Sequence, residues 1–128
     1  MVSIKVTCAI ISYKGKTLVT QRGKNMSLPL KWEFPGGKVE PNESEIDCVT
    51  REIHEELNIE IEIISKLESS FFDYPSKSIE LIPFISIYKS GEIILKEHEQ
   101  YLLLDKADLV NLDWADADIP ILKQYMRL

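Results

Sequence analysis

Three glutamates stand close together in residues 51–56 (REIHEE). Glu52, Glu55 and Glu56 are spaced i, i+3 and i+4, so a helix places all three on one face. Like charges at this spacing repel, each pair costing about 0.2–0.5 kcal/mol, and a face built for solubility would intersperse lysines. Converging carboxylates instead offer oxygen ligands to a hard divalent cation. The segment therefore predicts an acidic, metal-binding helix, against the alternative of a solvated acidic face.

The helix that carries these acids is expected over residues 44–57. Apolar residues recur there at helical spacing, with charges on the other faces, at Ile46, Val49, Ile53 and Leu57. Glu43 and Ser44 stand at the start, where acidic groups and hydroxyl caps suit a helix N-terminus. Six residues before Glu43 lies Gly37, preceded by Gly36, and adjacent glycines let the backbone approach a ligand closely. A glycine loop at this distance from an acidic helix favours a binding site over a plain turn.

The rest of the chain alternates β-rich runs with short helical segments. Strands are expected at 3–13, 17–22, 59–72, 78–88 and 92–96, and helical segments near 106–111 and over 118–126. Residues 1–128 contain no internal repeat, low-complexity tract or linker, and this length suits one domain. The order predicts a single α/β (α+β) domain, in which helices pack on a mixed sheet.

Composition and charge exclude several classes of protein. The formal net charge is -6, so a surface for long nucleic acids is not expected, because phosphate backbones need clustered Lys and Arg. The N-terminal run does not resemble a signal peptide, and no stretch approaches ~18 continuous apolar residues. Cys8 and Cys48 lack metal-binding spacing and are interpreted as reduced packing thiols. We therefore expect a cytoplasmic monomer or homodimer with no membrane partner.

The glycine loop and the acidic helix together resemble the Nudix box, written G-x5-E-x7-R-E-U-x-E-E-x-G-U with U aliphatic. The matching positions are Gly37, Glu43, Arg51, Glu52, Ile53, Glu55, Glu56 and Ile59. Asn58 stands where the pattern has glycine. That position closes the helix, where asparagine is the usual left-handed substitute, so we expect a small cost in stability and none in activity. Residues 32–38 (WEFPGGK) and 117–120 (ADIP) look like the MutT branch, closest to its CTP-pyrophosphohydrolase and oxidised-nucleotide members.

The resemblance covers essentially the whole chain and implies the Nudix α/β/α sandwich, a mixed β-sheet with helices on both sides. It also implies Mg²⁺-dependent hydrolysis of a nucleoside triphosphate to monophosphate and pyrophosphate, with Mn²⁺ as a substitute ion. The implied metal ligands are the Gly36 carbonyl, Glu52, Glu55, Glu56 and Glu97. Arg51, held by Glu43, is implied to orient the catalytic helix without touching substrate. Glu97 is an extra ligand or general base, against a solvated loop charge, and Glu99 is the competing assignment.

By the same resemblance the nucleotide base lies beyond the phosphates, near Arg22, Phe34 and Asp118. An aromatic face suits base stacking, although Phe34 also fits a plain core position. Asp118 matches the position of a base-reading asparagine in the MutT branch, and it also suits a cap for the last helix. Lys38 is expected either to meet phosphate or to stay in solvent. His98 is a candidate substrate contact.

The preferred base is predicted from Asp118. An ionised aspartate only accepts hydrogen bonds, whereas asparagine both donates and accepts. Oxidised guanine offers an N7–H donor beside an O6 acceptor, which one aspartate oxygen would oppose, whereas cytosine presents an N4 amino donor. We therefore expect cytosine nucleotides to be preferred over 8-oxo-dGTP, a preference that a protonated Asp118 would reverse. The alternatives are a Nudix hydrolase of ADP-ribose or dinucleoside polyphosphates, and a non-catalytic Nudix-fold module, which the complete set of box acids disfavours.

Overall fold

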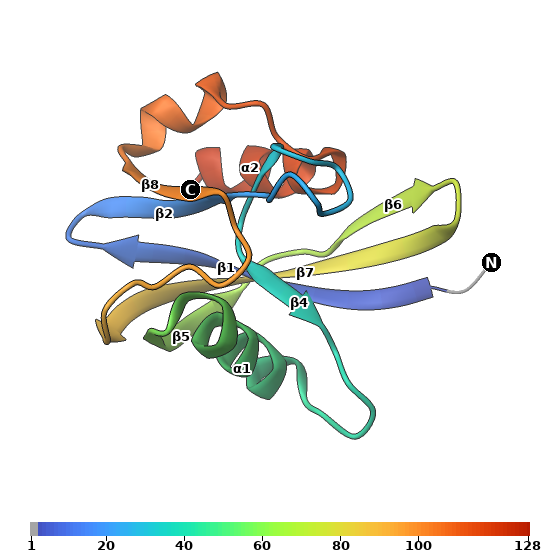
Figure 1. Cartoon of the computed structure of the whole chain (residues 1–128), viewed down its shortest axis with the longest axis horizontal. Coiled ribbons are helices and arrows are strands. Elements are labelled where there is room, and N and C mark those ends of the chain that lie inside the picture. Colours follow the sequence, from blue (N-terminus) through green and yellow to red (C-terminus); the bar gives the residue numbers. More distant parts are fainter. Residues whose placement is uncertain (1–2) are drawn as a thin grey trace.

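The computed structural model describes residues 3–128 of the chain (Figure 1). Its elements follow in the order β1 (Ser3–Tyr13), β2 (Lys16–Gln21), β3 (Trp32–Glu33), β4 (Gly36–Lys38), α1 (Glu45–Leu57), β5 (Glu60–Lys66), β6 (Ser70–Tyr74), β7 (Lys77–Ser90), β8 (Gln100–Leu104), the 3-10 helices η1 (Lys106–Asn111) and η2 (Asp116–Asp118), and α2 (Ile119–Met126). The sheet is mixed, because β1 runs parallel to β7 and antiparallel to β2 and β4.

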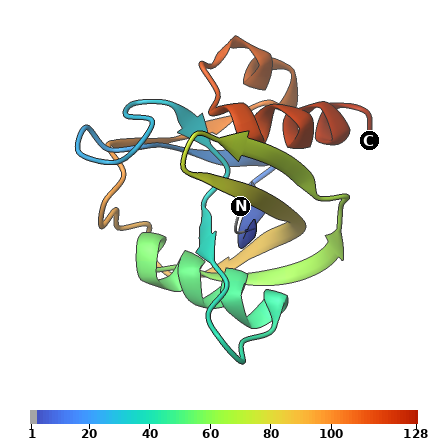
Figure 2. The same ribbon diagram turned by 90° about the vertical axis from the view of Figure 1, so that its right-hand side faces the viewer.

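β1 is a central strand that is buried on both faces. Its side chains alternate, so that Cys8 and Ile10 join one hydrophobic cluster while Ala9 and Ile11 join another. Helix α1 covers the face of the second cluster, and α2 with η1 covers the face of the first. Figure 2 shows the sheet between these two helical layers. The expected α/β/α sandwich is therefore confirmed.

The segment that holds β3 and β4 lies between β1 and β2. The β1–β2 hairpin pairs only near its turn, beyond which the two strands separate. β3 then pairs with residues 20–21 of β2, while β4 pairs with residues 6–8 of β1. This split brings Gly36 and Gly37 into the middle of the sheet, against the helix that carries the acids.

Helix α1 has the ends that its sequence predicts. The Ser44 hydroxyl accepts the Asp47 N–H at 3.1 Å, which caps the first turn. Asn58 ends the helix with φ 62°, the left-handed conformation expected where the pattern has glycine. Val49 and its helical neighbours Ile53 and Leu57 are buried, but Ile46 is 51% exposed. The first turn stands beside the edge strand β5, where a shallow groove leaves Ile46 uncovered.

Two predicted strands differ in the structure. The run 59–72 forms two strands, β5 and β6, with a break between them. The strand predicted at 92–96 is wrong, because this segment bonds to the end of α1. Ile94 and Lys96 donate their N–H groups to the Leu57 and Glu56 carbonyls at 3.0 and 3.2 Å, so they satisfy helix-end carbonyls that lack helical partners. Strand β8 was not predicted.

Two expectations concern the whole chain. Cys8 and Cys48 are both buried free thiols, as expected. Across residues 3–128, no helix combines the length and the apolar character needed to cross a membrane.

Candidate active site

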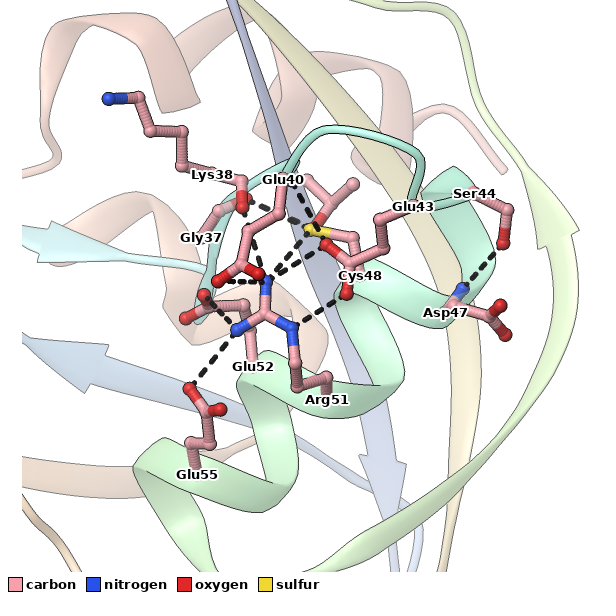
Figure 3. A network of polar contacts seen from close by, with 11 residues as sticks. Gly37, Lys38, Glu40, Glu43, Ser44, Asp47, Cys48, Arg51, Glu52 and Glu55 are labelled. Atoms are coloured by element: carbon pink, nitrogen blue, oxygen red, sulfur yellow. Dashed lines mark hydrogen bonds and ion pairs between the residues drawn. The ribbon is translucent and has the colours of Figure 1, made fainter.

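Arg51 lies at the centre of a network of acids at the start of α1 (Figure 3). Its Nε donates to Glu43 Oε2 at 2.7 Å, and its Nη2 donates to Oε1 of the same carboxylate at 3.0 Å. These side-chain hydrogen bonds lower the pKa of Glu43 to about 2 and raise the pKa of Arg51, so both groups stay charged. Nη2 also donates to the Lys38 carbonyl at 3.3 Å, which ties the end of β4 to the helix.

Two of the box glutamates also bond to Arg51. Its Nη1 donates to Glu52 Oε1 at 2.8 Å and to Glu55 Oε2 at 3.1 Å. Burial raises the pKa of Glu52, and its carboxyl group lies so close to Gly37 that a Cβ there would overlap it. The side chain of Glu55 is mostly exposed. A side chain at position 37 would therefore displace the Glu52 carboxylate from its place beside Arg51.

Glu56 is the box glutamate that is most deeply buried. Burial, together with the charges of Glu33, Glu52 and Glu97, raises its pKa to about 9. The Gly36 N–H donates to its carboxyl group, while Oε1 has no hydrogen-bond partner among residues 3–128. A buried carboxyl oxygen without a partner costs free energy. A cation at this oxygen would remove that cost and favour the ionised form.

The donor set of this region fits a hard divalent cation, which prefers carboxylate and carbonyl oxygens. Among residues 3–128, however, no three His, Cys, Asp or Glu side chains are grouped around one point. Arg51 holds Glu52 and Glu55, and only Glu56 carries an unpartnered buried oxygen in this set. The other two carboxylates would have to change rotamer to share an ion with Glu56.

The segment before β8 brings Glu97 to the end of α1. The Lys96 N–H donates to the Glu56 carbonyl at 3.2 Å, and the charge of Glu97 contributes to the raised pKa of Glu56. Glu99 instead lies 3.8 Å from the ammonium group of Lys24, at the exposed surface. Of the two candidates for the extra glutamate, Glu97 is thus the one that acts on the box acids.

The side chain of Glu33 links residues 96–99 to Arg22, which directly follows β2. Its Oε2 lies 2.9 Å from Nε2 of His98, and its Oε1 accepts from Arg22 Nη1 at 2.8 Å. The other guanidinium nitrogens of Arg22 donate to the carbonyl and the hydroxyl of Ser27, at 2.5 and 2.8 Å. The side chain of His98 has no exposed surface, which disfavours this residue as a candidate substrate contact.

A cleft of about 470 Å³ opens beside Glu33. Arg22, Glu33 and Asp118 supply polar groups to its wall, and its apolar wall includes Val6, Tyr74, Ile79 and Leu81. Its volume is in the range of small-molecule sites. Two further hollows, one beside α2 and one between α1 and β5, contain none of these polar groups. Glu33 links this cleft to the acidic region, because its charge acts on both Glu56 and Asp118.

Asp118 is a buried residue that lines the cleft. Its Oδ2 accepts the Phe34 N–H at 2.9 Å, and it makes no side-chain hydrogen bond to cap α2. Burial, and then the charge of Glu33, raises the pKa of Asp118 well above its usual value. This environment works against the ionised aspartate assumed from the sequence. A protonated carboxyl group donates as well as accepts, as asparagine does, so in that form Asp118 would not favour cytosine.

The remaining expected substrate residues have different surroundings. Phe34 is only 2% exposed, and its ring packs on Trp114 with the centroids 4.8 Å apart. Phe34 thus occupies the core position that is the alternative to base stacking, and its backbone N–H is what reaches Asp118. Lys38 is exposed, and its side chain points away from the Arg51 network (Figure 3).

Sequence reasoning missed Glu33 and Tyr74 as cleft residues. Glu33 follows the buried Trp32 in a strand of two residues, which is too short to show an alternating pattern. The one available signal was that a strand residue next to a buried tryptophan faces the other way. Tyr74 reaches the cleft because β6 pairs with β7, a pairing that its own sequence does not reveal.

Comparison with known proteins gives a consistent result over the whole chain. Residues 1–125 match the family described as the NUDIX domain. The CTP pyrophosphohydrolase of Escherichia coli (strain K12) is 34% identical over 128 residues, which cover 100% of this chain and 95% of that protein. The 8-oxo-dGTP diphosphatase of the same strain is 27% identical, with 100% of each chain covered. The solution structure of MutT from methicillin-resistant Staphylococcus aureus 252 has a TM-score of 0.79 at 38% identity, over 98% of this chain and 96% of that one.

The sandwich, the glycine loop and the acidic helix define an enzyme, a hydrolase that acts on pyrophosphate bonds. The chain belongs to the Nudix family, and its relatives and structural neighbours are MutT-like members. The resemblance inferred from the box residues is confirmed.

Proposed function

We propose that this enzyme hydrolyses a nucleoside triphosphate to a nucleoside monophosphate and pyrophosphate, with Mg²⁺ as its cofactor. The observation that carries the proposal is the Glu56 carboxyl group, which is largely buried and has an oxygen without a partner among residues 3–128. A buried acid surrounded by other acids is costly unless a cation neutralises it. The charge of Glu33 acts on both Glu56 and Asp118, so the acidic region and the cleft adjoin as a polyphosphate and its base require.

The proposed metal ligands are the Gly36 carbonyl and the carboxylates of Glu52, Glu55, Glu56 and Glu97. These are oxygen donors only, which suits Mg²⁺, and Mn²⁺ is expected to substitute because it accepts the same donors. When bound, the ion neutralises polyphosphate charge and orients the phosphates.

The protein's own groups then have separate roles. Arg51 and Glu43 hold the start of α1 against the glycine loop, because Arg51 bonds to both Glu43 and the Lys38 carbonyl. Glu97 is our candidate for the group that takes a proton from the attacking water, because it is exposed to solvent and lies near Glu56. Glu99 lies near Lys24 and is a weaker candidate. Lys38 is free to meet the phosphates from the exposed end of β4.

The base is proposed to bind in the cleft, which Asp118, Arg22 and Glu33 line with polar groups. We propose a cytosine nucleotide as the preferred substrate, because the more similar of the two named relatives, at 34% identity over the full chain, is a CTP pyrophosphohydrolase. The raised pKa of Asp118 favours 8-oxo-dGTP as a second candidate, because a protonated carboxyl group can donate to O6 and accept from N7–H. A relative that is 27% identical is an 8-oxo-dGTP diphosphatase.

The reaction is tested by running it in oxygen-18 water with a panel of nucleoside triphosphates and Mg²⁺. We expect the label in pyrophosphate and none in the monophosphate, because water attacks the β-phosphorus in the MutT-like reaction. Orthophosphate as the main product would reject the proposal. Turnover of ADP-ribose or dinucleoside polyphosphates in preference to every triphosphate would move the enzyme to another Nudix class.

A further inference from the structure

His98 is a buried residue in an exposed segment. Lys96, Glu97 and Glu99 are all exposed, whereas the side chain of His98 has no exposed surface. Its Nε2 lies 2.9 Å from Glu33 Oε2, and because a carboxylate only accepts hydrogen bonds, Nε2–H is the donor. Its Nδ1 is buried and has no partner among residues 3–128. An apolar side chain would fill this space without leaving a nitrogen unpaired, so packing alone does not explain the histidine.

The hydrogen bond from His98 joins a carboxylate and a chain segment that are each held by other contacts as well. Glu33 bonds to Arg22 through its second oxygen, so its carboxylate cannot swing freely. On either side of His98, the chain is held by backbone hydrogen bonds, from the Lys96 N–H to Glu56 and from the Glu99 N–H to Gln21.

Glu97 lies between these anchors. Its carbonyl oxygen lies close to Gly23, where a Cβ would stand only 2.6 Å from it. The charge of its side chain reaches Glu56. The direction of the Glu97 carboxylate therefore depends on how firmly residues 96–99 are held. His98 supplies the buried side-chain anchor, whereas the ion pair of Glu99 with Lys24 is exposed.

We propose that His98 is a positioning residue that holds Glu97 toward the box acids through its hydrogen bond to Glu33. The kinetic consequence of this proposal rests on the proposed function. The anchoring does not, because it is a property of the protein without substrate or metal. Because Glu33 also lines the cleft, the same hydrogen bond links the base site to the segment that carries Glu97.

The kinetic experiment compares His98→Leu with His98→Gln. Leucine removes the donor, whereas the glutamine amide places an N–H group near the position of Nε2. We expect His98→Leu to lower kcat by about 10–100-fold, the range found for outer partners of metal ligands, with KM for the nucleotide changed less than about twofold. His98→Gln should restore most of kcat. A rise in KM with unchanged kcat would instead make His98 a substrate contact and overturn the proposal.

A second comparison tests whether His98 acts through Glu97. In a Glu97→Gln background, adding His98→Leu should lower kcat by less than about twofold, because the group that His98 positions is already lost. If the two substitutions instead lower kcat independently, so that their factors multiply in the double variant, the proposal is overturned.

The anchoring is measured without any activity, by amide hydrogen exchange in the metal-free protein. Residues 96–99 should exchange faster in His98→Leu and at the wild-type rate in His98→Gln. If His98→Leu does not fold, His98→Asn replaces it, because its shorter amide does not reach Glu33. Unchanged exchange overturns the proposal whatever the kinetics show. If exchange follows the expected pattern but no nucleotide is hydrolysed by the wild-type protein, the proposed function fails and the anchoring stands.

Discussion

The acids of α1 and the polar residues of the cleft adjoin each other, yet they are held in opposite ways. Arg51 bonds to Glu43, Glu52 and Glu55, partners at most eight residues away in the chain. At the cleft, Arg22 has near partners in Ser27 and Glu33, but two further contacts join residues distant in sequence, Phe34 to Asp118 across 84 positions and Glu33 to His98 across 65. The first region is organised by charge on one helix and its preceding loop, and the second by the topology of the sheet.

The difference extends to protonation. Arg51 lowers the pKa of Glu43, whereas burial raises the pKa of Asp118. Glu56 lies at the boundary, since it belongs to the acidic helix but burial raises its pKa, as it does for Asp118. We infer that changes among the acids should alter the rate and leave the fold intact, and that loss of a polar group in the cleft should weaken use of the nucleotide base.

The largest effect is expected from Glu56→Gln, which replaces the glutamate between the acidic helix and the cleft with a neutral amide. Turnover should fall by roughly 10²–10⁴-fold, because several kcal/mol of charge stabilisation depend on the ion held there. Thermal stability should hold or rise, since a buried carboxyl group surrounded by acids is replaced by a neutral amide. Steady-state kinetics and melting curves measure the two effects.

Glu62→Gln is the matched control, because Glu62 is exposed on β5 and lies outside the acid network. It should leave both turnover and stability unchanged. A near-wild-type rate for Glu56→Gln, or full activity of the wild-type enzyme in excess EDTA, would remove the metal assignment and with it the contrast between the two regions.

A smaller loss of rate is expected from Arg51→Lys. Lysine keeps the charge but lacks the planar fork that bonds to Glu43 at two points and to Glu52 and Glu55 with another nitrogen. We expect kcat to fall by about 10–100-fold, as for other residues that orient metal ligands, while the relative rates for different bases stay constant. A changed base preference in this variant would show that the two regions are not separable.

The acid network should also leave a signature in the pH dependence of stability. The pKa of Glu43 is lowered to about 2 in the folded chain from an ordinary value near 4.5. Its contact with Arg51 therefore stabilises the fold above about pH 4.5, and this contribution is lost as the pH falls toward 2. The melting temperatures of the wild type and Glu43→Gln should differ most at pH 6 and converge near pH 2. A gap that is constant with pH would mean that the contact contributes through packing alone.

The same contrast explains what the sequence could predict. Residues of the acidic region are close in sequence, so helical spacing alone placed Glu52, Glu55 and Glu56 on one face, and the pattern of α1 located both of its ends. The sandwich followed from the order of strands and helices and from the resemblance to the Nudix box.

The cleft could not be predicted in the same way. Its walls come from β1, the loop after β2, β3, β6, β7 and the segment around η2, and no local pattern shows that these meet. Burial was the other limit. The sequence shows that Phe34 is aromatic and that Asp118 is acidic, but only packing shows that the ring lies in the core and that the carboxyl group is desolvated.

The smallest effect is expected from Asp118→Asn, which tests the protonation that distinguishes the cleft from the acidic helix. If Asp118 is protonated, its hydroxyl donates and its other oxygen accepts, and asparagine reproduces both functions. The ratio of kcat/KM for 8-oxo-dGTP to that for CTP should then change by less than about threefold, whereas one mismatched polar contact, worth ~1–3 kcal/mol, would change it about tenfold or more. Asp118→Leu is the control that removes both functions and should lower kcat/KM for both substrates. A shift of tenfold toward 8-oxo-dGTP in Asp118→Asn would show that Asp118 is ionised in the complex, and the preference for cytosine would then rest on that charge.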